Sequence, residues 1–312
     1  MSTRSTLLIG GGGFIGRAVA RALAGRRRVA VLDIGSRPPS GLPEEAAFHT
    51  GDFSDPATLD EALEGVDEVV HLAYASVPKT SFEHPVDDIL RNLPPVVGLF
   101  EELVKRRVGK VVLVSSGGTV YGQAQYLPID EKHPTFPISP YGITKLTVEK
   151  YGLMYRHHQG LPLVIVRPAN PFGEEQAPFR GQGFVSTAMA SVMQGKDIII
   201  FGKTGIVRDY LHVDDVAAGI AAALEEGLPG EIYNIGSGRG HSNQDLLAAL
   251  APLAHKAGLP IRIHEEPARP FDVLSNVLDC SKLAAHAGWK PSLDFSEALE
   301  RTWDHLALTW QT

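Results

Sequence analysis

Residues 7–16, Leu-Leu-Ile-Gly-Gly-Gly-Gly-Phe-Ile-Gly, decide the fold of this chain. A short apolar run enters four consecutive glycines, and a helical pattern follows. Glycines let the backbone turn tightly and approach a pyrophosphate, whose charge then lies at the helix N-terminus. The run fits G-x-G-x-x-G, and no Gly-Lys-Ser/Thr follows it, which argues against a P-loop. These residues predict a dinucleotide site that includes Gly10, Gly13, Phe14, Ile15 and Gly16.

Asp33 supports this prediction because it ends the second predicted strand, about 20 residues after the glycines. A carboxylate there can accept hydrogen bonds from both adenosine ribose hydroxyls, and it would repel a 2′-phosphate. NAD is therefore favoured over NADP, although Arg37 nearby leaves NADP as the alternative. Asp52 and Phe53 follow a third strand, and we expect them to bracket the adenine.

The first two-thirds of the chain alternates short Val-, Ile- and Leu-rich runs with longer helical patterns. Apolar runs without polar alternation are typical of parallel strands buried on both faces. The order predicts an α/β fold with a doubly wound parallel sheet, the Rossmann fold. The expected strands are 5–10, 28–33, 68–72, 110–115 and 161–167, and the expected helices are 14–24, 56–63, 86–107 and 140–159.

After residue 167 this rhythm weakens. Residues 168–183 are rich in Pro, Gly and Asn and predict one long loop, which in a compact domain is usually functional. Further helices are expected at 214–226, from Ser242, and at about 295–308. We expect a dinucleotide-binding domain over 1–170, also including about 205–232, and a smaller C-terminal α/β lobe over 171–312 that binds the substrate.

Composition limits the classes of partner. The 312 residues are 44% hydrophobic and 21% charged, with a net charge of -7, which argues against nucleic acid or an anionic membrane as the main partner. The single cysteine, Cys280, excludes an internal disulfide and suits a reducing compartment. No leader pattern, membrane-spanning run or metal-ligand spacing is found, so a cytoplasmic protein without a bound metal is expected.

Tyr141 and Lys145 are the strongest candidates for chemistry. Ser139 and Pro140 suit the N-cap and first position of a helix, and residues four apart on a helix share a face. At pH 7 only about one free tyrosine in a thousand is ionised, so a tyrosine base needs roughly 4 kcal/mol of selective support. A neighbouring ammonium is one source of that support.

The chain resembles the extended short-chain dehydrogenase/reductase family, within its NAD-dependent epimerase/dehydratase branch. The resemblance extends over nearly the whole length and is closest to the UDP-glucose (UDP-galactose) 4-epimerases. The matching segments are Gly10–Gly16, Asp33, His71-Leu72-Ala73, Ser115-Ser116-Gly117-Gly118-Thr119-Val120-Tyr121-Gly122, Tyr141…Lys145, Arg167-Pro168-Ala169-Asn170-Pro171, Arg208-Asp209-Tyr210 and Arg269-Pro270.

The resemblance implies a role for each of these positions. Tyr141 would remove a proton from a sugar hydroxyl. Lys145 would hold the nicotinamide ribose and, with the cationic nicotinamide ring, lower the pKa of Tyr141. Leu72 and Ala73 would contact NAD. The nucleotide diphosphate of the substrate would be held by Asn170, Arg208 and Arg269.

One position departs from the family. A Ser or Thr usually stands four residues before the Tyr of the Val-Tyr-Gly segment, where this chain has Gly117. Ser116 and Thr119 flank the position, and either hydroxyl could hydrogen-bond the reacting group.

The resemblance also limits the reaction. The 4,6-dehydratases of this branch have an Asp-Glu pair where this chain has Gly118 and Thr119, and UDP-glucuronate decarboxylases have a Glu at the latter position. The epimerase-reductases that make GDP-fucose use an extra Cys and His, but Cys280 lies in no matching motif. A nucleotide-sugar 4-epimerase acting on a UDP-sugar is the main expectation.

Two alternatives stay open, a net NAD(P)-dependent sugar dehydrogenase or reductase and a catalytically silent NAD-binding sensor. Members of the family commonly form dimers through the helices that match 86–107 and 140–159, so a homodimer is expected.

Overall fold

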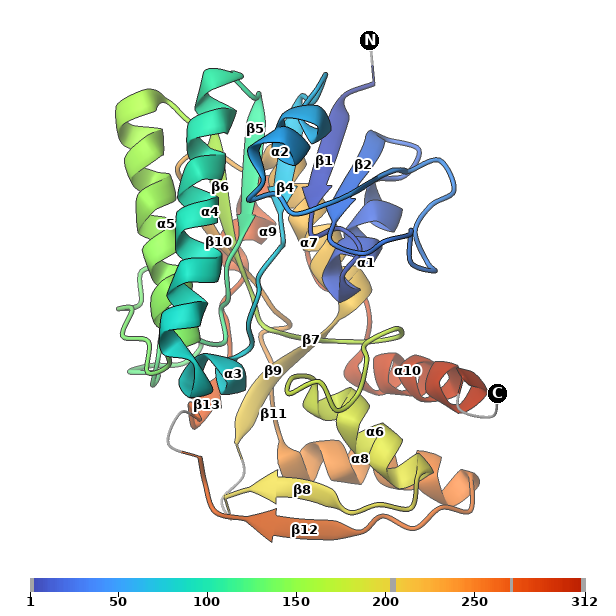
Figure 1. Ribbon diagram of the computed structural model, residues 1–312. Coiled ribbons are helices and arrows are strands. Elements are labelled where there is room, and N and C mark those ends of the chain that lie inside the picture. The colour runs from blue at the N-terminus through green and yellow to red at the C-terminus, as the bar shows by residue number, and fades with distance from the viewer. Residues whose placement is uncertain (1–2, 203–205, 270–271, 310–312) are drawn as a thin grey trace.

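A seven-stranded parallel sheet forms the centre of the larger lobe (Figure 1). The computed structural model describes residues 3–202, 206–269 and 272–309. Neighbouring strands of the sheet all pair in parallel, in the order β10-β6-β5-β4-β1-β2-β3. The predicted doubly wound fold is therefore confirmed. The strands are β1 (Ser5–Ile9), β2 (Arg28–Asp33), β3 (Ala47–Thr50), β4 (Glu68–His71), β5 (Lys110–Val114), β6 (Leu163–Pro168) and β10 (Ile232–Ile235).

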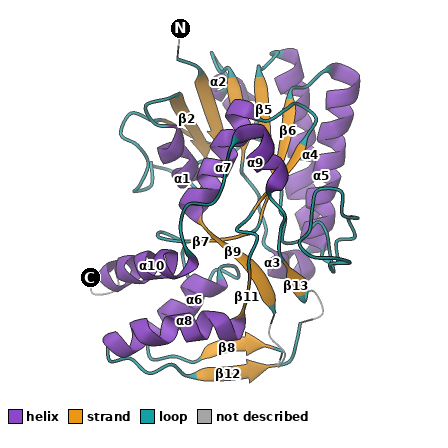
Figure 2. Ribbon diagram, turned by 180° about the vertical axis from the view of Figure 1, so that it is seen from behind, coloured by secondary structure: helices purple, strands orange, loops and turns teal. Residues whose placement is uncertain are grey.

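Helices cover both faces of this sheet, as Figures 1 and 2 show from opposite sides. One face carries α1 (Phe14–Leu23), α7 (Val213–Glu226) and α9 (Ser281–Ala287), and the other carries α2 (Pro56–Ala62), α4 (Pro85–Lys105) and α5 (Pro140–Gln159). Each layer contributes to its own buried apolar cluster. Because both faces are covered, the middle residues of the central strands are apolar, which is the pattern that the sequence shows, and polar residues such as Glu68, His71 and Arg167 stand at or near the strand ends.

The smaller lobe lies beyond the carboxyl ends of these strands (Figure 1). It has a third apolar cluster of its own, formed mainly by its helices and β8. Its strands form a four-stranded and a two-stranded sheet. The elements are β7 (Asn170–Phe172), α6 (Phe184–Met193), β8 (Ile198–Phe201), β9 (Val207–His212), β11 (Gly240–Ser242), α8 (Asn243–Lys256), β12 (Ile263–Glu266), β13 (Ser275–Asn276) and α10 (Phe295–Thr309).

The structure corrects the expectation of one loop over 168–183. β7 lies within this segment and pairs with β9, and Phe172 is buried with ring contacts to Tyr210 and His212. The helix α3 (Pro78–Glu83) and most strands of the smaller lobe were not predicted from the sequence. The range 205–232, which was expected to belong to the larger domain, contributes to both lobes. β9 joins the four-stranded sheet of the smaller lobe, while α7 packs on the main sheet. The domain boundaries stay a prediction.

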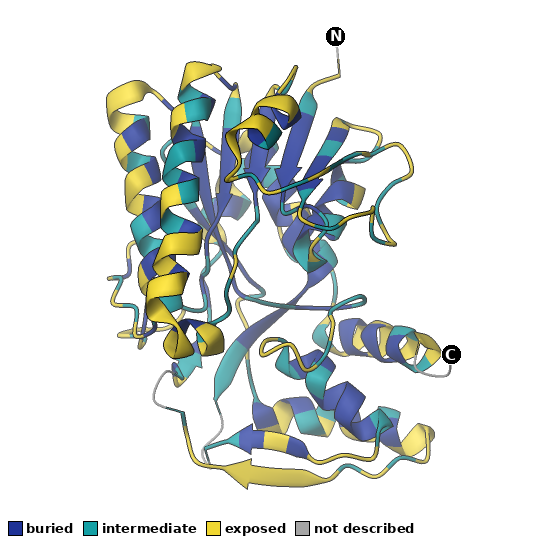
Figure 3. Cartoon of the chain, viewed as in Figure 1, coloured by how far each residue is buried: buried dark blue, intermediate teal, exposed yellow. Residues whose placement is uncertain are grey.

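The distribution of exposed residues separates the central sheet from the outer helices (Figure 3). The central strands are buried, whereas α4 and α5 expose much of their outer faces. No helix in the described part of the chain is both long and apolar enough to cross a membrane.

Candidate active site

Tyr141 and Lys145 lie in the first turns of α5, at the junction of the two lobes. The backbone N–H of Gly142 donates to Ser139 Oγ at 3.1 Å, and Pro140 occupies the first turn, so the helix begins as the sequence predicts. The Lys145 ammonium lies 5.9 Å from the Tyr141 ring centroid and donates to the carbonyl of Val114 at 3.0 Å. The two side chains therefore lie on one face of the helix, above the end of β5.

Burial has the largest effect on the pKa values of both side chains. Burial and the charge of Asp88 raise the pKa of Tyr141, and a hydrogen bond with Ser116 opposes them. Burial lowers the pKa of Lys145 to about 8, while Glu149 and Asp88 act in the opposite direction. Without a cofactor the pKa of the phenol is raised, because desolvation of the phenolate outweighs the opposing hydrogen bond. The lowering expected from Lys145 and the nicotinamide ring together stays a prediction.

Ser116 is the hydroxyl that bonds to Tyr141, and the structure shows why residue 117 is a glycine. A Cβ atom at Gly117 would lie 2.6 Å from Leu278 Cδ1 and 2.8 Å from the carbonyl oxygen of Arg167. A serine in that position would have no room. The role of Ser116 or Thr119 toward the reacting hydroxyl stays a prediction. Thr119 also lines the cavity, and its buried Oγ1 has no hydrogen-bond partner in the described part of the chain.

A cavity of about 800 Å³ extends from Tyr141 into the smaller lobe. Small-molecule sites commonly have this size. Its wall includes Ser116, Lys79 and Gln182 as well as the three residues expected to hold a nucleotide diphosphate, namely Asn170, Arg208 and Arg269. The cavity therefore brings the candidate catalytic and substrate-binding residues together.

The three candidate diphosphate ligands are placed differently. Asn170 has a buried Nδ2 without a partner among the described residues. Burial lowers the pKa of Arg208, whose Nη1 donates to the carbonyl of Val207 rather than pairing with Asp209. Arg269 forms a two-pronged ion pair with Asp272, and its guanidinium lies 4.3 Å from the Phe201 ring centroid. Pro270, the other residue of that sequence segment, lies outside the described residues.

The glycine-rich turn forms a cradle that side chains would fill. Gly10 has a φ of +80°, and a Cβ there would lie 2.6 Å from the backbone of Ala73. A Cβ at Gly16 would lie 2.5 Å from the Cα of Gly11. Gly13 is the N-cap of α1 and has no side chain that could accept a hydrogen bond. The first backbone N–H groups of the helix, including those of Phe14 and Ile15, therefore face the turn without a side-chain cap. These features fit the pyrophosphate of a dinucleotide.

Asp33 lies at the end of β2 beside this cradle. Its carboxylate accepts hydrogen bonds from the backbone N–H groups of Gly12 and Gly35 at 3.0 and 3.2 Å. These bonds fix the carboxylate in the position predicted for the adenosine ribose. Arg37, the residue that left NADP open, is exposed.

The other candidate cofactor residues surround the carboxyl end of β4. The N–H groups of Leu72 and Ala73 both donate to the carbonyl of Ile9, which holds them against the glycine turn. The Phe53 ring packs edge-on against His71, with ring centroids 5.2 Å apart. Asp52 is exposed and accepts a hydrogen bond from the backbone of Ser54.

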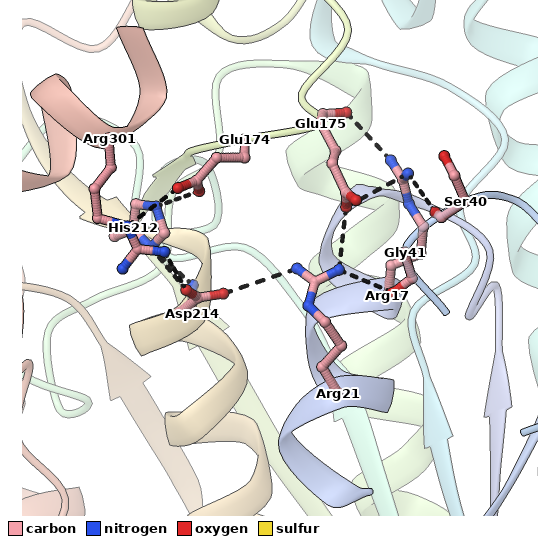
Figure 4. A network of polar contacts seen from close by, with 9 residues as sticks. All are labelled: Arg17, Arg21, Ser40, Gly41, Glu174, Glu175, His212, Asp214 and Arg301. Carbon is pink, nitrogen blue, oxygen red and sulfur yellow. Dashed lines mark hydrogen bonds and ion pairs between the residues drawn. The ribbon is translucent and has the colours of Figure 1, made fainter. Parts of the chain in front are cut away.

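An ionic network connects the cofactor side of the molecule to the substrate side (Figure 4). Arg17 of α1 donates to the carbonyls of Ser40 and Glu175, at 3.0 and 3.2 Å. These contacts join the loop after β2 to the segment after β7.

The same network continues to the C-terminal helix. Arg301 of α10 pairs with Glu174 at 3.1 Å and Asp214 at 3.0 Å, and the buried His212 lies 2.7 Å from Glu174. Burial opposes ionisation of Glu174, but the hydrogen bond with His212 and the charge of Arg301 outweigh it and lower its pKa to about 2.

Two residues near Tyr141 were absent from the sequence-based site. Tyr74 follows the Leu72-Ala73 segment, and its ring lies against both Tyr141 and Lys145. Asp88, in the first turn of α4, is buried and accepts a hydrogen bond from Thr144 of α5. In the sequence Asp88 is indistinguishable from any acidic residue in a first helical turn, so no local signal could have identified it. In the described part of the chain, no group of three or more His, Cys, Asp and Glu side chains is arranged to hold a metal ion.

Comparison with known proteins agrees with this geometry. The sequence family described as the NAD dependent epimerase/dehydratase family matches residues 6–236. The UDP-glucose 4-epimerase of Mycolicibacterium smegmatis is 32% identical, over 95% of this chain and 96% of that protein. A dTDP-glucose 4,6-dehydratase of Streptomyces antibioticus is 30% identical, over 96% of this chain and 91% of that protein.

A solved structure extends the comparison to the fold. The UDP-glucose 4-epimerase of Thermus thermophilus in complex with NAD superposes with a TM-score of 0.90 at 34% identity, covering 97% of this chain and 99% of that one. The expected family, the expectation of an enzyme and the dependence on NAD are confirmed together. The chain belongs to the NAD dependent epimerase/dehydratase family.

Proposed function

We propose that this protein is a nucleotide-sugar 4-epimerase that interconverts the C4 epimers of a UDP-sugar through a transient 4-keto intermediate. The observation that carries the proposal is a cavity wall in which Tyr141, hydrogen-bonded to Ser116, is the ionisable group beside the end of β5. Among the described residues of that wall, the carboxylates are Asp197 and Asp272, and both belong to the smaller lobe. A dehydratase would need an added acid and base near Tyr141, but positions 118 and 119 are Gly and Thr.

The residues present can perform the proton transfers of an epimerisation. Tyr141 exchanges a proton with the C4 oxygen, and Ser116 orients the phenol through its hydrogen bond. In the protein alone the phenol is protonated at neutral pH, which suits donation to a ketone oxygen. Lys145 supplies positive charge during the opposite transfer. Bound NAD provides the acceptor for the C4 hydride and its return to the other face of the ketone.

Binding of the remainder of the substrate follows from the same cavity. Arg208 and Arg269 would hold the diphosphate, since guanidinium groups suit its charge and geometry. Asn170 would donate its unpartnered N–H to an oxygen of the nucleotide sugar. Lys79 and Gln182 line the wall and are candidates to contact the sugar.

The test is a panel of UDP-, GDP- and dTDP-sugars assayed for inversion at C4 with added NAD. Tyr141→Phe should keep NAD binding and lower turnover by orders of magnitude, because a phenyl ring exchanges no proton. Tyr126→Phe, at an exposed tyrosine outside the described lining of the cavity, is the matched control and should keep full activity. Unchanged turnover in Tyr141→Phe would remove the proposed mechanism.

The spectrum of bound NAD separates the alternatives. Reduction of bound NAD on adding UDP-sugar, without stoichiometric NADH release, supports epimerisation. Accumulating NADH supports a net dehydrogenase, and an unchanged spectrum supports a sensor.

We further propose that the protein is a homodimer formed through α4 and α5. They carry exposed apolar side chains, which are Val86, Ile89, Leu90, Ile143, Tyr151 and Met154. Several of these lie three or four residues apart and therefore form a stripe on each helix. Light scattering after size exclusion should give twice the mass of the chain, and Leu90→Glu should convert it to the monomer. A cytoplasmic location stays a prediction.

A further inference from the structure

Tyr74 packs against both members of the proposed reactive pair. The Lys145 ammonium is 4.2 Å from the centroid of the Tyr74 ring, which is close to ideal for a cation–π contact. The Tyr74 and Tyr141 rings are T-shaped, with centroids 4.7 Å apart and planes at 66°. Tyr74 is not among the described residues that line the cavity. It therefore contacts both reactive side chains without lining the cavity.

Asp88 connects this ring to α5. Its carboxylate, 2% exposed, accepts a hydrogen bond from Thr144 Oγ1 at 2.6 Å and another from the hydroxyl of Ser76. The Tyr74 hydroxyl lies 3.4 Å from Asp88 Oδ1 and 3.4 Å from the backbone carbonyl of Tyr141. Thr144 directly precedes Lys145 in the sequence. One buried carboxylate therefore holds the loop after β4 and the first turns of α5 together.

The backbone supports the same arrangement. The N–H of Tyr141 donates to Ser81 Oγ at 3.1 Å, and the N–H of Ala75 donates to Asn92 Oδ1 at 2.8 Å. Asn92 in turn donates to the carbonyl of Asp88 at 2.7 Å. Three segments that are far apart in the sequence thus converge on the start of α5.

Burying a carboxylate is costly unless it has hydrogen bonds and a nearby opposite charge. The hydrogen bonds described for the Asp88 carboxylate come from hydroxyl groups, and its charge acts on Lys145. Besides Tyr74, Tyr141 and Asp88, the ionisable groups that interact with Lys145 in the described part of the chain are Glu149 on α5 and His71 on β4. Glu149 is also paired with Arg167 at 2.6 Å. Burial and the charge of Lys145 lower the pKa of His71 to about 3. Neutral His71 adds no charge, so Asp88 and Glu149 are the anions that face Lys145.

We propose that Tyr74 and Asp88 are positioning residues for the proposed reaction, the ring holding the Lys145 ammonium and the carboxylate fixing the start of α5 against the loop after β4. This inference rests on the proposed function of Tyr141 and Lys145. A purely structural role would need only shape at residue 74 and hydrogen-bonding capacity at residue 88. A positioning role also needs the π face of the ring and the charge of the carboxylate.

Asp88→Asn tests the charge while keeping the shape. Asp88 raises the pKa of both Tyr141 and Lys145, so its loss should lower both. Both limbs of the pH profile of kcat/KM should therefore move to lower pH, by roughly 0.5–2 pH units for one charge at this range. Asp215→Asn is the matched control, because Asp215 is 3% exposed and accepts hydrogen bonds from Ser292 and Leu293, away from the cavity. It should lower stability and leave the profile in place.

Tyr74→Leu and Tyr74→Phe test the ring. The leucine variant loses the cation–π contact, and kcat should fall about 2- to 30-fold with a smaller change in KM for the nucleotide sugar. The phenylalanine variant keeps the ring face and should retain most of kcat. Equal loss in both variants, or wild-type kcat in Tyr74→Leu, would overturn the role assigned to the ring.

A measurement without turnover separates this inference from the proposed function. Carbon-13 NMR of labelled lysine should give a pKa near 8 for Lys145 in the wild type and a lower value in Asp88→Asn. An unshifted lysine pKa, or an even loss of activity across pH, contradicts the role of Asp88. If the pKa of Lys145 shifts in Asp88→Asn but the wild type inverts no sugar in the panel, the contacts of Tyr74 and Asp88 with the pair are supported and the epimerase proposal is refuted.

Discussion

Replacing Gly117 with alanine is the change whose cost follows most directly from the geometry. The added Cβ would lie 2.6 Å from Leu278 Cδ1, 2.8 Å from the carbonyl oxygen of Arg167 and 3.1 Å from that of Pro168. Two of these three atoms belong to the backbone of β6. Gly117 does not have a positive φ, so the cost is steric rather than conformational.

The surroundings can move little. The Gly117 N–H donates to the carbonyl of Pro168 at 2.8 Å, and the Gly117 carbonyl accepts from Asn276 Nδ2 at 2.9 Å. Leu278 is fully buried. Overpacking of this kind costs about 1–3 kcal/mol of unfolding free energy. Each kcal/mol lowers Tm by roughly 2–4 °C in domains of about 150–250 residues, so a fall of several degrees is expected.

Gly118→Ala provides the matched comparison. A Cβ at Gly118 would have its nearest neighbour, Asn170 Oδ1, at 3.5 Å, which is ordinary contact. Urea and thermal unfolding of both variants should show Gly117→Ala destabilised and Gly118→Ala close to the wild type. Gly117→Ala should also lose activity, because the shift displaces Ser116 from the phenol. If Gly117→Ala unfolds with the wild-type midpoint, the steric explanation for this departure from the family is wrong.

Three further predictions address binding and stability. Arg208→Met should weaken UDP binding about 10- to 100-fold in calorimetry and leave NAD binding unchanged, since a charged hydrogen bond contributes about 1.5–3 kcal/mol. The same UDP affinity in the variant and the wild type would exclude Arg208 from the diphosphate site. Glu174→Gln should lower the free energy of unfolding near neutral pH. The loss relative to the wild type should shrink as pH falls from about 4.5 to 2, because the lowered pKa of Glu174 in the folded state stabilises the protein only while the carboxylate is ionised. A loss that is the same at every pH in denaturant titrations would contradict this. Arg17→Met should release NAD faster in stopped-flow experiments, because the loop at Ser40 loses a hydrogen bond. Arg26→Met, at an exposed arginine, should release NAD at the wild-type rate. Equal release rates for the two variants would show that the network of Figure 4 does not retain the cofactor.

The sequence was sufficient for the elements whose signals are local. The middle residues of the central strands are apolar because both faces of the sheet are covered. The sequence also contains both caps of α5, which are Ser139 at the N-terminus and Gly160, with a left-handed conformation, at the C-terminus. β3 was harder, since no residue of it is buried and its side chains show no apolar run. The smaller lobe was harder still, because its short strands pair with partners far along the chain.

In the site, too, only the features with a local sequence signal could be predicted. Tyr141 and Lys145 could be predicted to share a face from their spacing alone. The direction of the Tyr141 pKa could not, because burial and Asp88 act on it and neither is visible in the local sequence. The lack of room for a side chain at Gly117 could not be predicted either, because Leu278 fills that space from a distant part of the chain.

The position of β10 has a consequence for synthesis of the protein. This strand pairs with β6 at the border of the main sheet, yet about 60 residues, which include several elements of the smaller lobe and α7, separate the two along the chain. During translation the hydrogen-bonding edge of β6 stays open until those residues have left the ribosome, and an open apolar edge recruits other strands. Nascent chains that stall before Ile232 are therefore expected to need a chaperone, and a fragment ending near residue 170 is expected to aggregate when expressed alone.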